Sequence, residues 1–188
     1  MKYKTIKKLM SDYVKGETSV KVGIVWHFTA GGSRSGAEAQ LALPDTINVT
    51  ILIDKDGTRY QYLEENQWAY HTGKGKSIDK VSFGVEIVNW GPLTKVDNLY
   101  LPWTMKKAQA VAKENVVKVS RFRGYEYFEK LTLQQVESAL ELKRDWYSRF
   151  KIQWETTHAV LNKNKLDFPP DYPQINEIIL SEPAGASF

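Results

Sequence analysis

The run VGIVWHF, residues 22–28, sets the expected fold class of this chain. Its β-branched and aromatic residues form an almost unbroken apolar sequence, which is typical of a strand buried on both faces of a sheet. The loop TAGGSRSG follows at once, so the run predicts a strand that ends near His27. A strand end is a rigid position from which a side chain can hold a ligand.

The run VSFGVEIVNW, residues 81–90, predicts a second buried strand, and Glu86 lies inside it. Ionised carboxylates are seldom buried without a partner. Two partners remain open from the residues alone: a cation in a salt bridge on the sheet face, or a water molecule bound to a metal ion. Glu86 is therefore a candidate functional residue.

Apolar residues at helical spacing predict three helices, over residues 3–14, 35–43 and 133–150. The third should begin with a capping box, because Thr132 is followed three positions later by Gln135. The apolar face expected for this helix consists of Leu133, Val136, Leu140, Tyr147 and Phe150.

Two further segments have contrasting patterns. Residues 47–62 predict a β-hairpin, because two β-rich arms flank the turn sequence Asp56-Gly57. Residues 92–130 are expected to form a partly irregular insertion, with some helical character at residues 105–113. Strands and helices alternate along the chain, so the expected fold is α/β, with a mixed central β-sheet flanked by helices.

Composition narrows the possible functions. The 188 residues suit one domain over residues 1–188, with a mobile tail at 181–188. The net charge is +4, and no run of five basic residues occurs, so no nucleic-acid partner is expected. No apolar run is long enough to span a membrane. The N-terminus lacks the apolar core of a secretory signal, so synthesis in the cytoplasm is expected.

Only three histidines occur, and there is no cysteine. Disulfides and cysteine ligands are excluded, so a zinc site would need imidazole and carboxylate groups. His158 and Asp167 bracket a segment, residues 157–170, that is too rich in Asn, Lys and Pro for a strand or helix and is expected to be a loop. With His27 they would leave a fourth zinc position for water. The alternative is that these are ordinary polar residues and that Asp167 only starts a turn.

Five motifs in order resemble a known family. They are IVWHFTAGG (24–32), ILIDKDGTRYQ (51–61), AYHTG (69–73), SFGVEIVN (82–89) and THAVLNKNKLDFPP (157–170). Together they resemble the type-2 N-acetylmuramoyl-L-alanine amidases, in the superfamily that includes the peptidoglycan recognition proteins. The resemblance covers roughly residues 20–173, which is nearly the whole chain.

The resemblance implies a zinc-dependent enzyme that cuts the amide between N-acetylmuramic acid and L-alanine of the stem peptide. It implies that Zn²⁺ is bound by His27, His158 and Asp167, and that Glu86 and Lys165 are catalytic. His71 matches a position that is usually near the substrate. The chain departs from the family pattern at Thr157, before the second histidine, at Phe168, after the aspartate, and at Val49, where some phage amidases have a catalytic tyrosine.

The expected function is therefore a peptidoglycan hydrolase, a phage endolysin that acts on the bacterial cell wall as a monomer. Its expected partner is peptidoglycan or a muropeptide, with no membrane involved. Several alternatives remain open: a cytoplasmic amidase that recycles anhydro-muropeptides, a non-catalytic peptidoglycan-binding module, a metal-free structural domain, and an enzyme that cuts a different amide.

Overall fold

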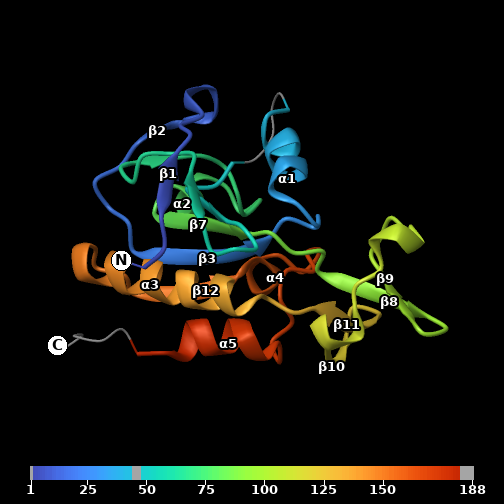
Figure 1. The fold of residues 1–188 in the computed structure, drawn as a ribbon. Coiled ribbons are helices and arrows are strands. Elements are labelled where there is room, and N and C mark those ends of the chain that lie inside the picture. The colour runs from blue at the N-terminus through green and yellow to red at the C-terminus, as the bar shows by residue number, and fades with distance from the viewer. Residues whose placement is uncertain (1, 44–47, 183–188) are drawn as a thin grey trace.

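A six-stranded sheet forms the centre of the computed structural model, which describes residues 2–43 and 48–182 (Figure 1). The strand order is β1–β5–β4–β7–β3–β12, and all neighbours are parallel except β4 and β5. The predicted mixed sheet is thus confirmed. In sheet order, the strands are Thr5–Lys7, Arg59–Gln61, Ile51–Ile53, Ser82–Ile87, Gly23–Phe28 and Trp154–Thr157.

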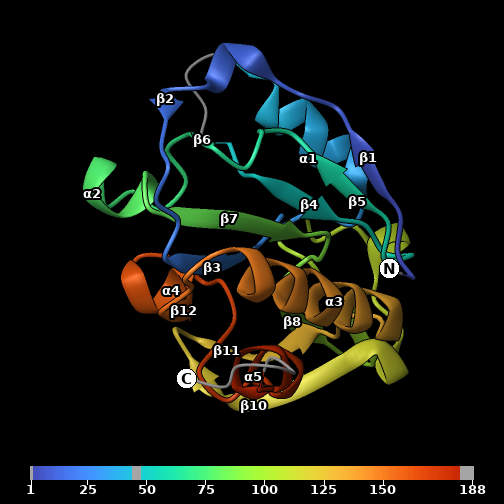
Figure 2. The ribbon, with the colours of Figure 1, turned by 90° about the vertical axis from the view of Figure 1, so that its left-hand side faces the viewer.

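The two predicted buried strands, β3 and β7, lie side by side in the sheet, and every residue in both is buried. Helices α3 (Leu133–Arg149) and α5 (Pro173–Leu180) cover one sheet face, as Figure 2 shows below the strands. The rings of Phe83 and Trp146 stack there with centroids 4.0 Å apart. Because both faces of these strands are covered, their sequences are mostly apolar, and His27, Ser82 and Glu86 are the polar exceptions.

Helix α3 begins with the predicted capping box, in which the side chains of Thr132 and Gln135 each accept a hydrogen bond from the other residue's backbone N–H. Its predicted apolar face needs one correction. Leu133 is 68% exposed, although Gln135 and Val136 in the same turn are both buried. The fully buried stripe also includes Ala139, Leu142 and Trp146, and the predicted Leu140, Tyr147 and Phe150 are partly buried against the same core.

Helix α1 (Arg34–Leu41) matches the helix predicted over residues 35–43 and lies over the opposite sheet face. Its Ala37 and Leu41 belong to a small apolar cluster with Leu52 and Val88. The predicted hairpin is also confirmed, since β4 and β5 pair antiparallel around the turn that contains Gly57. Residue 47, at the start of the predicted hairpin, lies outside the described residues, as do residues 183–188 of the predicted mobile tail.

The helix predicted over residues 3–14 is wrong. This segment contains strand β1 and a single 3-10 turn, η1 (Ser11–Tyr13). Strand β1 pairs in parallel with β5 at the edge of the sheet, so sheet hydrogen bonds replace those of a short, weakly amphipathic helix.

The insertion at residues 92–130 is more regular than predicted. Four antiparallel strands form a separate sheet in the order β10–β11–β8–β9, which projects from the body in Figure 1. Only single 3-10 turns, η2 (Lys107–Gln109) and η3 (Lys113–Asn115), represent the expected helical character. The strands are β8 (Pro92–Val96), β9 (Leu99–Leu101), β10 (Val116–Phe122) and β11 (Tyr125–Glu129).

The insertion leaves and rejoins the body at one point, because the backbone N–H of Glu129 donates to the carbonyl of Gly91 over 3.0 Å. The smaller elements are β2 (Gly16–Glu17), which pairs with β6 (Gln67–Trp68), and the short helices α2 (Lys76–Asp79) and α4 (His158–Leu161). Among the residues described, no helix combines the length and apolar character that a membrane span requires.

A buried ion pair joins the helical layer to the sheet. Lys143 of α3 lies 2.7 Å from a carboxylate oxygen of Glu155 in β12, and both side chains are almost fully buried. Lys143 also donates to two carbonyls of α5, and the indole of Trp26 donates to the second oxygen of Glu155 over 3.0 Å. Four elements therefore meet at one buried charge pair.

We predict that Glu155→Gln lowers the free energy of unfolding by about 3–5 kcal/mol, because it leaves the Lys143 ammonium buried without a counter-charge. The matched control is Glu126→Gln, which removes an exposed pair at 3.8 Å and should cost less than about 1 kcal/mol. Urea denaturation measures both values. Equal unfolding midpoints for the two variants would contradict this role of the buried pair.

Candidate metal centre and active site

The sheet register brings three candidate residues together. His27 is in register with Glu86 on the neighbouring parallel strand β7, and Trp26 is in register with Thr157 on β12. His158 follows Thr157 directly and so lies beside His27. Because the three strands are parallel, their carboxyl ends meet at one edge, where α/β proteins commonly bind ligands.

The segment predicted to be a loop therefore needs a correction. Its first residue, Thr157, ends strand β12, and α4 then begins at His158. The polar sequence of this region gave no sign of a strand. Strand β12 is only partly buried and lies at the edge of the sheet, where β3 is its one partner among the described strands. This strand is what fixes the position of His158.

Asp167 reaches the same point from the loop that follows α4. One oxygen of its carboxylate accepts a hydrogen bond from the backbone N–H of Phe28 over 3.2 Å. The next residue, Phe168, is fully buried, and its ring contacts those of Phe28 and Tyr172. Phe168 has a φ of 47°, which is uncommon for a bulky residue, so the packing of its ring holds a sharp bend immediately after Asp167.

The three candidate ligands converge closely. The Nδ1 atoms of His27 and His158 are 2.9 Å apart. The Asp167 carboxylate lies 3.9 Å from Nδ1 of His27 and 3.5 Å from that of His158. Two ligand atoms at tetrahedral positions around zinc are separated by about 3.3 Å, given metal–ligand bonds of about 2.0–2.1 Å. These distances fit a shared metal ion.

Hydrogen bonding fixes the tautomer of His27. The hydroxyl of Ser82 donates to the carbonyl of Ile78, so it can only accept from Nε2 of His71, 3.1 Å away. His71 therefore carries its proton on Nε2, and its Nδ1 accepts from Nε2 of His27 over 3.1 Å. This chain of hydrogen bonds leaves an unprotonated Nδ1 on His27, directed at His158.

A separate hydrogen bond gives His158 the same tautomer as His27, with Nδ1 unprotonated. Its Nε2 lies 2.9 Å from the carbonyl oxygen of Thr72, which can only accept, so Nδ1 of His158 is also an unprotonated acceptor. Burial lowers the pKa of His27 well below its usual value and that of His158 to about 4, so both rings are neutral at pH 7. Two lone pairs and a carboxylate thus surround one point with no proton between them, which is the donor set that a divalent metal ion requires.

The Asp167 carboxylate supplies the negative charge of this donor set. Burial raises the pKa of Asp167 to about 6, against the opposing effect of the hydrogen bond from the Phe28 N–H. The group is still mostly ionised at pH 7. The donor set is therefore two neutral imidazoles and one carboxylate, the combination found with an open fourth position in catalytic zinc sites.

Glu86 lies beside this cluster as a candidate base. Burial raises the pKa of its carboxyl group well above the usual value, and nearby Asp167 raises it further, while Lys165 acts in the opposite direction. Its Oε2 has no hydrogen-bond partner among the described residues, and no ion pair involving Glu86 occurs within them. The salt-bridge alternative from the sequence therefore finds no support in residues 2–43 and 48–182.

A cavity of about 560 Å³ opens over the cluster. Glu86, His158 and Asp167 line it, and exposed Lys165 stands at its edge. The insertion contributes two aromatic side chains to the wall, and α1 forms another part. The other lining residues are Phe28, Thr29, Ala30, Ala37, Gln40, Leu41, Trp90, Pro92, Trp103, Tyr125, Asn164 and Leu166.

His71 is buried behind His27 and is not part of the cavity lining. It packs over Gly84, where an added Cβ would lie 3.0 Å from Nδ1 of His71 and would press against the ring. The expected contact between His71 and substrate stays a prediction.

Sequence analysis missed Ser82 and the insertion's aromatic residues. A signal for Ser82 was present, because Ser82, Gly84 and Glu86 alternate along one strand and so share a face. The aromatic residues had no such signal, since their position depends on the fold of the insertion.

Comparison with known proteins identifies the family of this chain. The family model described as N-acetylmuramoyl-L-alanine amidase matches residues 18–170. No curated protein sequence matches the chain. Among solved structures, the N-acetylmuramoyl-L-alanine amidase LysC from Clostridium intestinale superimposes with a TM-score of 0.59 at 17% identity, covering 93% of this chain and 94% of that one.

Two other structures extend the comparison. A mutant endolysin from Bacillus subtilis gives a TM-score of 0.56 at 16% identity and covers 93% of this chain and 92% of that one. AmiD from E. coli, in complex with anhydro-N-acetylmuramic acid-L-Ala-D-γ-Glu-L-Lys, superimposes with a TM-score of 0.51 at 18% identity. The match covers 77% of this chain but only half of AmiD. At these identities the structures show a common fold, while the family match over residues 18–170 leads to the conclusion that this chain belongs to the N-acetylmuramoyl-L-alanine amidase family.

Proposed function

We propose that the chain is a zinc-dependent peptidoglycan hydrolase that cuts the amide between N-acetylmuramic acid and L-alanine. The observation that carries this proposal is the pair of unprotonated Nδ1 atoms of His27 and His158, 2.9 Å apart beside the Asp167 carboxylate. A zinc ion held by these three residues would supply a Lewis acid that polarises the scissile carbonyl and lowers the pKa of a water molecule to about 7.

Glu86 is the proposed general base. Its unpartnered Oε2 is free to accept the proton of the attacking water. The raised pKa suits this task, because a base whose pKa lies nearer the working pH can later return the proton. Glu86 then transfers that proton to the nitrogen of the L-alanine leaving group, which departs as a neutral amine.

Lys165 is the proposed stabiliser of the oxyanion. Its ammonium group belongs to the exposed edge of the cavity and affects the pKa values of both Glu86 and Asp167. A hydrogen bond from Nζ to the carbonyl oxygen would strengthen as that oxygen gains charge in the transition state. This is differential binding, which raises the rate rather than the affinity for substrate.

An endolysin role is favoured by how much of two solved structures this chain covers. The chain spans more than nine-tenths of the Clostridium and Bacillus proteins, and one of these is named as an endolysin. The recycling alternative has one observation in its favour, the AmiD complex with an anhydro-muropeptide. A binding-only module is disfavoured because all five positions, His27, Glu86, His158, Lys165 and Asp167, carry the residue types that hydrolysis needs.

The deciding experiment is mass spectrometry of the products formed from purified peptidoglycan. We expect free stem peptides that begin with L-alanine, together with glycan strands that have intact lactyl groups. Faster release from intact sacculi than from soluble anhydro-muropeptides supports the endolysin role, and the reverse supports recycling. Products cut within the peptide or the glycan would show that the proposed bond is wrong.

Two isosteric variants separate metal binding from proton transfer. Asp167→Asn should reduce zinc content far below the one ion per chain expected of the parent, because it removes the anionic ligand. Glu86→Gln should keep the zinc and lose turnover by a factor of about 10²–10⁴, because an amide cannot accept the proton. Atomic absorption and product release measure the two effects. Full activity of the Glu86→Gln chain would rule out its role as base.

The hydrogen bond behind His27 gives a further prediction. His71→Phe should weaken zinc binding by about 10–100-fold, because it removes the acceptor that fixes the His27 tautomer. His71→Asn is the matched control, since its side-chain oxygen can occupy the place of Nδ1 and should retain most of the affinity. Competition against a chromophoric chelator measures both constants. Equal affinities in the two variants would show that the ring acts by packing alone.

A further inference from the structure

The insertion places one indole at the mouth of the cavity. Trp103, in the segment between β9 and η2, lines the cavity and is nevertheless 68% exposed. An indole presents a large apolar surface, and at the mouth of a cavity that surface is available to a ligand. Building on the proposed function, we propose that Trp103 is a saccharide-stacking subsite for the sugar that adjoins the N-acetylmuramic acid of the scissile amide.

The Trp103 backbone is held in a defined turn. The N–H of Met105 donates to the carbonyl of Pro102 over 2.8 Å, which places Trp103 at a central position of a β-turn. The hydroxyl of Thr104 donates to the side-chain oxygen of Gln109 over 2.5 Å and ties this turn to η2. A binding platform of this kind loses little conformational entropy when a ligand is bound.

The indole itself is also fixed. Its Nε1–H donates to the carbonyl of Ala30 over 2.8 Å, and Ala30 belongs to the loop that follows His27. Trp90 holds the same loop through Gly32, where an added Cβ would lie 2.6 Å from its indole nitrogen. The only polar atom of the Trp103 ring is thus used within the protein, so the ring offers its ligand an apolar face.

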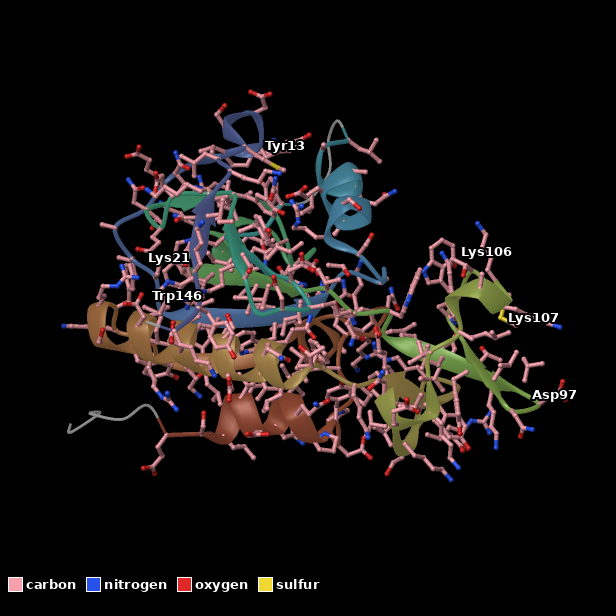
Figure 3. The ribbon with its side chains drawn as sticks, viewed as in Figure 1. Tyr13, Lys21, Asp97, Lys106, Lys107 and Trp146 are labelled. Atoms are coloured by element: carbon pink, nitrogen blue, oxygen red, sulfur yellow. The ribbon has the colours of Figure 1, made fainter. Side chains whose placement is uncertain are left out.

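This face fits a sugar better than a stem peptide. N-acetylated hexoses are uncharged, and their axial C–H groups form flat apolar faces that stack on aromatic rings. Stem peptides carry free carboxylates, which suit the cationic edge at Lys165. Lys106 and Lys107 follow Trp103 closely in sequence but do not line the cavity, and Figure 3 shows them at the outer end of the insertion. The wall at Trp103 therefore lacks charged lining residues within the described chain.

The first test uses a glycan without a peptide. Chitotriose, a trimer of β-1,4-linked N-acetylglucosamine, has no scissile lactyl amide, so its binding can be measured by NMR titration of the full chain. We expect Trp103→Ala to bind it about tenfold more weakly than the parent. Trp103→Phe, which keeps an aromatic face, should retain most of the affinity. Met105→Ala, also exposed but outside the cavity lining, should match the parent.

The second test uses turnover of two matched substrates, one bearing the disaccharide and the other only N-acetylmuramic acid on the same stem peptide. The parent should prefer the disaccharide through a lower KM, and Trp103→Ala should lose that preference while kcat on the shorter substrate is retained. An equal loss on both substrates would overturn the subsite, as would a parent chain that does not bind chitotriose. Trp103-dependent binding of chitotriose without amide hydrolysis would support the subsite and refute the proposed reaction.

Discussion

Two imidazole nitrogens that face each other with no proton between them are a costly arrangement in a dry protein interior. His27 and His158 are held in this arrangement by acceptors on their far sides, the ring of His71 and the carbonyl of Thr72. Burial disfavours protonation of either ring, because a charged imidazole there would be poorly solvated. A bound cation would remove this cost, so the arrangement supports the proposed metal site.

The sheet is what makes this possible. Strands β12, β3 and β7 pair in parallel, so the side chains at their carboxyl ends are held one strand spacing apart. Glycine at position 84 then leaves room for the His71 ring on the same sheet face. On the other face, the stack of Phe83 on Trp146 and the ion pair between Lys143 and Glu155 keep the strands in place.

Local signals made part of this structure predictable. The apolar runs at residues 22–28 and 81–90 and the capping box at Thr132 lie within short windows, so strands β3 and β7 and helix α3 could be predicted from the sequence. Strand β1 could not, because its stability depends on pairing with residues more than fifty positions away. The proposed metal-binding set came from family resemblance, since residue spacing alone left open whether His27, His158 and Asp167 were ordinary polar residues.

The hydrogen-bonded chain from Ser82 through His71 to His27 was beyond the reach of sequence analysis for a related reason. The direction of each hydrogen bond in this chain depends on which ring nitrogen holds the proton. The proton position can be deduced only from hydrogen-bond partners that the fold brings together. The aromatic wall at Trp90 and Trp103 has the same dependence, since Trp103 meets the loop at Ala30 from a separate sheet.

The hydrogen bond between Glu129 and Gly91 closes the insertion at its base, so the chain departs and returns at nearly the same place. A segment joined in this way can be exchanged for a shorter or longer one without rerouting the strands that carry the proposed catalytic groups. If Trp103 binds glycan as proposed, recombination at this one junction would change which glycans the chain accepts. The proposed reaction and the choice of substrate would then be inherited as two separable modules of one polypeptide.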